Sequence, residues 1–184
     1  MNAIEELLAR KSHNRLTEPA PTPEQLDIML RAAVRAPDHA QLRPWQFRIY
    51  AGESLMQLGE FFAIASQFED PDVSDSKVER IKNKPLRAPM VIVASVTITE
   101  HPKVPEVEQI LSAGASVQNL LIAAHFLGIG AIWRTGGLAF NRELMNLLEM
   151  PKNESIVGFI YLGKEEGSKR PVPQINLKEH VRWL

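Results

Sequence analysis

A cluster of basic side chains near the start of the chain is the first place in this sequence where charge could bind a ligand. Arg10, Lys11 and Arg15 surround the hydroxyl of Ser12, directly after an apolar segment. Guanidinium, ammonium and hydroxyl groups form strong hydrogen bonds to phosphate oxygens. Cations are also favoured at the C-terminal end of a helix, where the helix dipole is negative. The cluster therefore predicts either a phosphate-binding loop or an ordinary helix end.

Two further segments place a cation at the end of a predicted element. Arg35 and His39 flank a Pro-Asp pair that closes a helix, and a simple helix stop is the alternative interpretation. Trp133, Arg134 and Thr135 end a predicted core strand and lead into a glycine pair. Ligands of α/β proteins commonly bind at strand ends. A tryptophan packed in the core beside a surface arginine fits the same residues equally well.

The signatures of several other enzyme classes are missing from the sequence. There is no Walker loop, and Gly128-Ile129-Gly130 joins a helix to a strand, the reverse of a dinucleotide-binding loop. There is no G-x-S-x-G nucleophile motif. The five histidines lack the paired spacing of zinc ligands, and the absence of cysteine excludes thiolate nucleophiles and iron–sulfur ligands. Redox chemistry would therefore require a bound cofactor.

The composition indicates one folded domain that acts on small molecules. The 184 residues suit a single domain, and apolar and charged fractions of 45% and 23% are those of a folded protein. A net charge of −1 gives no excess of positive charge that would attract nucleic acid or an anionic membrane. The acidic start lacks the features of a secretion signal, and the cysteine-free sequence fits a reducing compartment. We expect a cytoplasmic protein.

Hydrophobic periodicity predicts helices and strands in alternation. Helices are expected over 2–11, 22–36, 55–68, 105–127 and 143–149, and strands over 45–51, 90–96, 131–135 and 156–162. Residues 70–87 are polar and weakly periodic, which fits a further helix or a mobile cover. Four strands separated by helices predict an α/β sandwich around a central sheet.

The middle of the longest predicted helix is unusually small. The run Ser112-Ala113-Gly114-Ala115-Ser116 would let another backbone approach closely. The run is suited to tight packing inside one subunit and equally to a helix pair across a dimer axis.

A series of short motifs runs along nearly the whole chain in a specific order and spacing. The motifs are Arg10-Lys11-Ser12 with Arg15, Pro21-Thr22, Arg31-Ala32, Arg35-Ala36-Pro37-Asp38-His39, Pro44-Trp45, Arg87-Ala88-Pro89, Lys103-Val104-Pro105, Ser112-Ala113-Gly114, Ile132-Trp133-Arg134, Ile156-Val157-Gly158-Phe159 and Tyr161-Leu162-Gly163. Together they resemble the nitroreductase-like FMN oxidoreductases, most closely the branch of small NAD(P)H nitroreductases.

This resemblance implies a fold and a binding site. The fold would be an α/β (α+β) sandwich with a central four- to five-stranded mixed sheet flanked by helices, forming one FMN-binding domain over 1–184 and an interlocked homodimer. FMN would lie at the subunit interface. The implied FMN-binding residues are Arg10, Lys11 and Ser12 on one flank, Trp133, Arg134 and Thr135 on the other, and Arg35 and His39 from the second subunit.

The resemblance also implies an activity. FMN would carry two electrons by a ping-pong mechanism from NADH or NADPH to a small nitroaromatic or quinone-like acceptor. The flavin performs the chemistry, so no catalytic side chain is expected, and Arg10 or Arg134 would stabilise negative charge on the reduced ring. The alternative is an FMN-binding carrier homodimer without nicotinamide turnover.

Two segments depart from the family pattern. Many members carry Asn-x-Gln-Pro-Trp where this chain has Gln41-Leu42-Arg43-Pro44-Trp45, which leaves the acceptor contacts near Gln41 and Arg43 unassigned. The pair Lys169-Arg170 follows the last strand where larger relatives place phosphate ligands, and no role is assigned to it.

Overall fold

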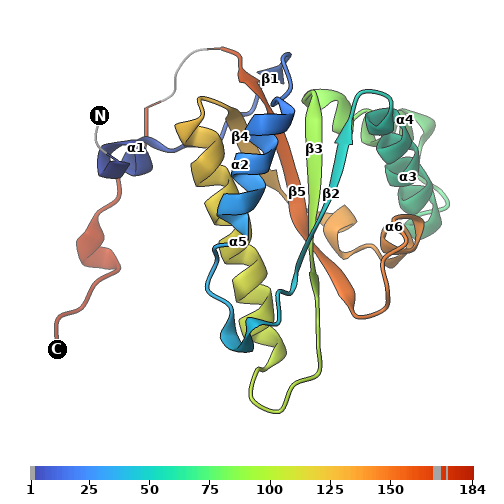
Figure 1. Ribbon diagram of the computed structural model, residues 1–184. Helices are drawn as coiled ribbons and strands as arrows, with labels where there is room; N and C mark the ends of the chain where they lie inside the picture. Colours follow the sequence, from blue (N-terminus) through green and yellow to red (C-terminus); the bar gives the residue numbers. More distant parts are fainter. Residues whose placement is uncertain (1–2, 168–170, 173) are drawn as a thin grey trace.

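The computed structural model describes residues 3–167, 171–172 and 174–184, and its centre is an antiparallel sheet (Figure 1). The long strand β5 (Glu154–Glu165) pairs with β3 (Met90–Thr97) on one side and with β4 (Gly130–Arg134) on the other. Next to β3 lies β2 (Trp45–Ala51), and the short β1 (Leu16–Thr17) pairs with the end of β5.

Every strand pairing within the described residues is antiparallel, so the expectation of a mixed sheet was wrong. Helices α3 (Ser54–Glu69) and α4 (Asp75–Lys82) run out and back between β2 and β3 and pack against each other. The chain therefore returns to the sheet beside the point where it left, because Met90 at the start of β3 pairs with Ala51 at the end of β2. The predicted α+β class is confirmed, and the sheet has five strands, within the four to five that the resemblance implied.

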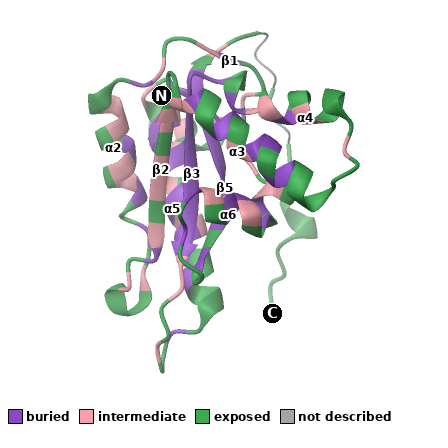
Figure 2. Cartoon of the chain, turned by 90° about the vertical axis from the view of Figure 1, so that its right-hand side faces the viewer, coloured by how far each residue is buried: buried purple, intermediate pink, exposed green. Residues whose placement is uncertain are grey.

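Helices cover both faces of the sheet (Figure 1). Helix α5 (Glu106–Phe126) packs on one face together with α2 (Pro23–Ala33), and α3, α4 and α6 (Arg142–Leu147) cover the other. Each face has its own apolar core, one around Ile92, Val117 and Ile160 and one around Phe62 and Phe159. Strand β3 is buried along nearly its whole length because both of its faces are covered (Figure 2).

Most of the elements predicted from the sequence are confirmed within two or three residues of their ends. The Thr22 capping box is present, since Gln25 N–H donates to Thr22 Oγ1 at 3.3 Å and Thr22 N–H donates to Gln25 Oε1 at 2.9 Å. Gly128, with φ +71°, directly follows the C-cap of α5 as predicted. Residues 70–87 contain α4, and the two-residue β1 had no sequence signal.

The N-terminal helix α1 (Ala3–Ala9) has no buried residue, and the described part of the C-terminal tail lies away from the sheet (Figure 1). The tail exposes several large apolar side chains: Ile175, Leu177, Trp183 and Leu184. None of the described helices combines the length and hydrophobicity that a bilayer span requires.

Candidate functional site

The basic loop, residues 10–15, lies along the edge of β4 that does not pair with β5. His13 N–H donates to the carbonyl of Ala131 at 2.9 Å, and Ala131 N–H donates back to His13 Nδ1 at 3.2 Å. Burial lowers the pKa of His13, although Glu165 opposes the shift. An imidazole held neutral keeps Nδ1 free to accept the backbone hydrogen bond. These two hydrogen bonds between His13 and Ala131 therefore hold the loop against the sheet.

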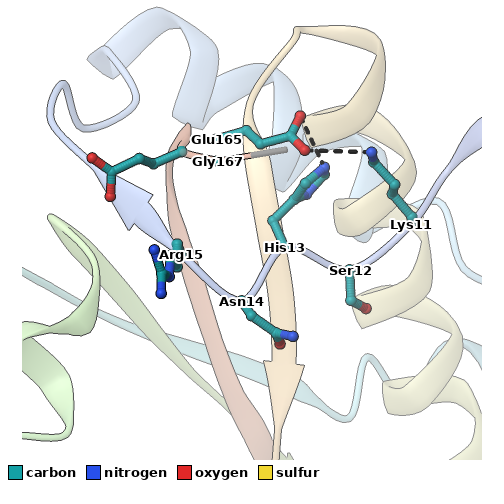
Figure 3. Close-up of a pocket in the computed structure, with 8 residues that line it drawn as sticks. Lys11, Ser12, His13, Asn14, Arg15, Glu165 and Gly167 are labelled. Atoms are coloured by element: carbon teal, nitrogen blue, oxygen red, sulfur yellow. Dashed lines mark ion pairs between the residues drawn. The ribbon is translucent and has the colours of Figure 1, made fainter. Parts of the chain in front are cut away.

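A cavity of about 280 Å³ opens between this loop and the end of β5 (Figure 3). Lys11, Ser12 and Arg15 line it from the loop, and residues 165–167 line it from the strand. Lys11 Nζ lies 3.4 Å from Glu165 Oε1, and His13 Nε2 lies 3.4 Å from Glu165 Oε2. Arg10 lies one residue outside the lining, at the end of α1, where its N–H donates to the carbonyl of Leu7.

A second cavity, of about 420 Å³, opens at the C-terminal end of β4. Trp133, Arg134 and Thr135 line it as the sequence predicts, together with Lys84 and Arg87 from the segment that precedes β3. No carboxylate is found among the described residues that line this cavity. The structure thus brings three cations together, and we call this the cationic cavity.

The charges of the cationic cavity have no internal counterion. Burial lowers the pKa of Lys84, and the positive charges of Arg87 and Arg80 lower it further. The Arg134 guanidinium carbon lies 5.8 Å from the ring centroid of Tyr161, and the buried Nε of Arg134 finds no hydrogen-bond partner among the described residues. Because three cations share the cavity and no carboxylate is among its described lining residues, an anionic ligand would suit it.

Arg35 and His39 lie elsewhere within a single chain. Arg35 lines a third cavity, of about 310 Å³, beside Asp38, Gln41 and Arg43. His39 is exposed on a 3-10 helix, His39–Gln41, and its Nδ1 lies 2.7 Å from Glu108 Oε2 of α5. Neither residue lines the cavities that contain Lys11 and Arg134.

The loop that follows His39 is strained. Ala40, Gln41 and Arg43 have φ values of 59°, 55° and 50°, a region that non-glycine residues seldom adopt. Asp38 holds the loop in this conformation, since its Oδ2 accepts from Arg43 N–H at 2.7 Å. Strained backbone of this kind is concentrated at functional sites.

Sequence reasoning missed the contributions of Lys84, Arg87 and Tyr161 to the cationic cavity. The Arg87-Ala88-Pro89 motif was visible, but nothing in the local pattern shows that this segment folds against β4. Lys169 and Arg170, to which no role was assigned, lie outside the described residues.

A long apolar groove runs along the exposed side of α5 and has a volume of about 870 Å³. It is lined by Leu111, Gly114 and Ala115 of α5 and by Phe140, which is 80% exposed. Ala113 and Ser116, from the same small-residue run, are buried inside the subunit. The run therefore serves internal packing on one side of the helix and lines the groove on the other.

The scattered histidines and acids do not converge on a metal site. Within the part of the chain that the structure describes, no group of three or more His, Cys, Asp or Glu side chains is placed to hold a metal ion.

The structure is an α+β protein with a cationic cavity at the end of β4, and comparison with known proteins identifies its family. Residues 7–164 match the model of the Nitroreductase family, and the chain belongs to that family. It is 41% identical over 164 residues to the "Putative NAD(P)H nitroreductase YdjA" of Escherichia coli (strain K12), covering 89% of this chain and 88% of that protein. A Haemophilus influenzae protein described as an NAD(P)H nitroreductase of the same kind is 34% identical over the full length of both chains.

Solved structures show the same fold at low sequence identity. The nitroreductase-like family protein of Bacillus cereus superposes with a TM-score of 0.85 at 21% identity, covering 100% of this chain and 96% of that one. A mutant of NfnB, which is described as an FMN- and NADPH-dependent nitroreductase from a sphigopyxis strain, superposes with a TM-score of 0.80 at 16% identity, covering 100% and 99%.

Proposed function

We propose that this protein is an FMN-dependent NAD(P)H oxidoreductase of the nitroreductase type. It passes two electrons from NADH or NADPH to a small nitroaromatic or quinone-like acceptor by a ping-pong mechanism. The observation that carries the proposal is the cationic cavity at the end of β4, where Lys84, Arg87 and Arg134 lie together and none of the described lining residues is a carboxylate. Membership of the nitroreductase family and its NAD(P)H-dependent relatives support it.

The residues present fit FMN. The isoalloxazine ring offers carbonyl and nitrogen acceptors, and Lys84, Arg87 and Arg134 supply donors to the lining of the cavity. A volume of about 420 Å³ lies within the range of cofactor sites, and Phe159 and Tyr161 are aromatic residues of its lining. Lys11 and Ser12, with Arg10 beside them, would hold the phosphate, because the loop that carries them runs along the same strand as Trp133 and Arg134.

When bound, FMN supplies the two-electron redox chemistry. Lys84, Arg87 and Arg134 would stabilise the negative charge that reduction places on the ring, in a cavity where partial burial strengthens electrostatic interactions. Trp133 and Thr135 would orient the ring at the strand end. No acid, base or nucleophile is required of the protein, so its residues bind, orient and set the electrostatic potential.

The homodimer is part of the proposal. The apolar groove along α5 and the exposed apolar residues of the tail offer surfaces that a second subunit could cover. In the dimer, Arg35 and His39 of one subunit would approach the flavin of the other, which explains why they lie outside both cavities of their own chain. The protein would be cytoplasmic, a single FMN-binding domain over 1–184, with no nucleic-acid or membrane partner.

The test of the proposed function is spectroscopic. The purified protein should be yellow or become so with FMN, and anaerobic addition of NADH or NADPH should bleach the visible absorbance. If the protein binds FMN but its spectrum does not change with NADH or NADPH, the carrier alternative is favoured. If the protein does not bind FMN, both the enzyme proposal and the carrier alternative fail. Double-reciprocal plots should be parallel, and intersecting lines would contradict the ping-pong order.

Replacing Arg10 with alanine should weaken FMN binding about tenfold, the effect of losing one charge-assisted hydrogen bond to phosphate. Flavin fluorescence titration measures the change. Arg31 is the control, because its side chain is exposed on α2, paired with Asp27 and remote from both cavities. Equal affinities of the R10A and R31A variants would remove Arg10 from the phosphate site.

A further inference from the structure

The indole of Trp133 lies in a closely fitted slot between two glycines. It packs with the apolar core on the α5 face of the sheet. On one side is Gly114 of α5, where an added Cβ would lie 3.9 Å from Cη2 of the indole, an ordinary contact. On the other side is Gly158 of β5, where an added Cβ would lie 2.0 Å from Nε1 and 2.5 Å from Cδ1. Any side chain at position 158 would therefore displace the indole.

A β-bulge in β5 supplies the polar contact of this slot. Ala94 of β3 pairs with Gly158 and Ser95 pairs with Ile156, so Val157 has no partner in β3. The carbonyl of Val157 accepts a hydrogen bond from Trp133 Nε1 at 3.2 Å. Bulges re-aim backbone groups, and a glycine within a strand often marks a close approach. The bulge and Gly158 thus fix both the position and the direction of the indole.

Trp133 matters beyond packing because it lines two cavities. The residue lines the end of β4 at the cationic cavity, and its indole, on the α5 side of the sheet, lies where the apolar groove along α5 also includes Trp133 in its lining. The slot on β5 therefore sets the orientation of the Trp133 side chain at the strand end where both cavities open.

We propose that Gly158 and the Val157 carbonyl form a seat for the Trp133 indole, and that Gly158 is a positioning residue for the aromatic ring bound beside Trp133. The seat is a property of the fold. Its role in ligand positioning rests on the proposed function, with FMN as the ring.

The seat is tested with a Gly158→Ala variant in a protein whose other tryptophans, Trp45 and Trp183, are phenylalanine. The emission of Trp133 should shift to longer wavelength, because the displaced indole enters water. The melting temperature should fall by about 5 °C, the size expected of an over-packed side chain in a chain of this length. Gly137→Ala is the control, since Cβ there meets open space at an ordinary φ. Unchanged emission in G158A overturns the seat.

A double-mutant cycle separates the slot from a general effect of alanine on β5. In a Trp133→Leu background the indole is gone, so G158A should lower the melting temperature by less than half of its effect in the parent. An equal effect in both backgrounds means that Gly158 does not act through Trp133, and it overturns the proposal. W133L retains an apolar side chain, which keeps the background folded.

The positioning role is tested by FMN titration of the same variants. G158A should weaken FMN binding at least tenfold and change the visible circular dichroism of the bound flavin, whereas G137A should do neither. Shifted emission with unaltered affinity and flavin spectrum overturns the positioning role. If the parent protein itself does not bind FMN, the proposed function fails. The emission and the double-mutant cycle still test whether Gly158 and the Val157 carbonyl hold the indole of Trp133.

Discussion

Replacing Arg48 with methionine should lower the free energy of unfolding by about 3 kcal/mol, because it leaves the carboxylate of Glu154 buried without its counterion. The Glu154 side chain is only 3% exposed. Its carboxylate accepts hydrogen bonds from both terminal nitrogens of Arg48 and from the Ser95 hydroxyl. The pair joins β2, β3 and β5 just beside the bulge at Val157.

The same pair should give the protein part of its acid sensitivity. Burial alone raises the pKa of Glu154, but hydrogen bonds from Arg48 and Ser95 outweigh burial and hold this pKa below its ordinary value of 4.5. A carboxyl whose pKa is depressed by folding stabilises the native state above pH 4.5 and loses this contribution as pH falls through the lowered pKa. R48M should therefore be less stable near neutral pH and lose less stability on acidification.

Urea denaturation between pH 3 and pH 7 measures both effects. In a double variant, R48M with Glu154→Gln, the buried charge is removed with its partner, and part of the lost stability should return. The exposed Arg31–Asp27 pair is the matched control, since R31M should change stability far less than R48M. If R48M costs no more than R31M, the pair does not hold the sheet together.

Arg48 also shows where sequence patterns are insufficient. The strand predicted over 45–51 alternates apolar residues such as Ile49 with Arg48 and Tyr50, and in a half-buried strand such a pattern buries the apolar set. In the structure Arg48 and Tyr50 are partly buried, whereas Ile49 is 40% exposed. The reversal arises because helices cover both faces of the sheet and Glu154, remote in sequence, supplies a buried partner for Arg48. Local periodicity cannot report such a partner.

The site was predictable to the same limited extent. The basic loop and the Trp133–Thr135 strand end are local signals, and the structure places both along β4. Lys84 gave no signal, because its role depends on how α3 and α4 return the chain to the start of β3. Residues that act through tertiary folding or a second subunit lie beyond single-sequence reasoning.

Replacing Lys84 with methionine should separate ligand binding from stability. In the free protein Lys84 is partly buried beside Arg87 and Arg80, and both burial and these charges lower its pKa. Folding therefore disfavours the charged lysine, and the native state gains stability as pH rises through the lowered pKa toward 10.5. K84M removes the unfavourable charge, so flavin-free K84M should melt at the same temperature as the parent or higher and lose this alkaline gain.

FMN binding should respond in the opposite direction. Without the ammonium group, K84M should bind FMN about tenfold more weakly. The midpoint potential of the bound flavin should fall by about 30 mV. This shift corresponds to a tenfold loss of affinity for the reduced form relative to the oxidised form. Lys152→Met, which removes an exposed lysine outside the cationic cavity, should change neither quantity. A K84M protein that is destabilised but keeps its flavin affinity and potential would show that Lys84 supports the fold and not the ligand. If K84M is instead stable and binds FMN more weakly, the bound anion balances the repulsion among Lys84, Arg87 and Arg134.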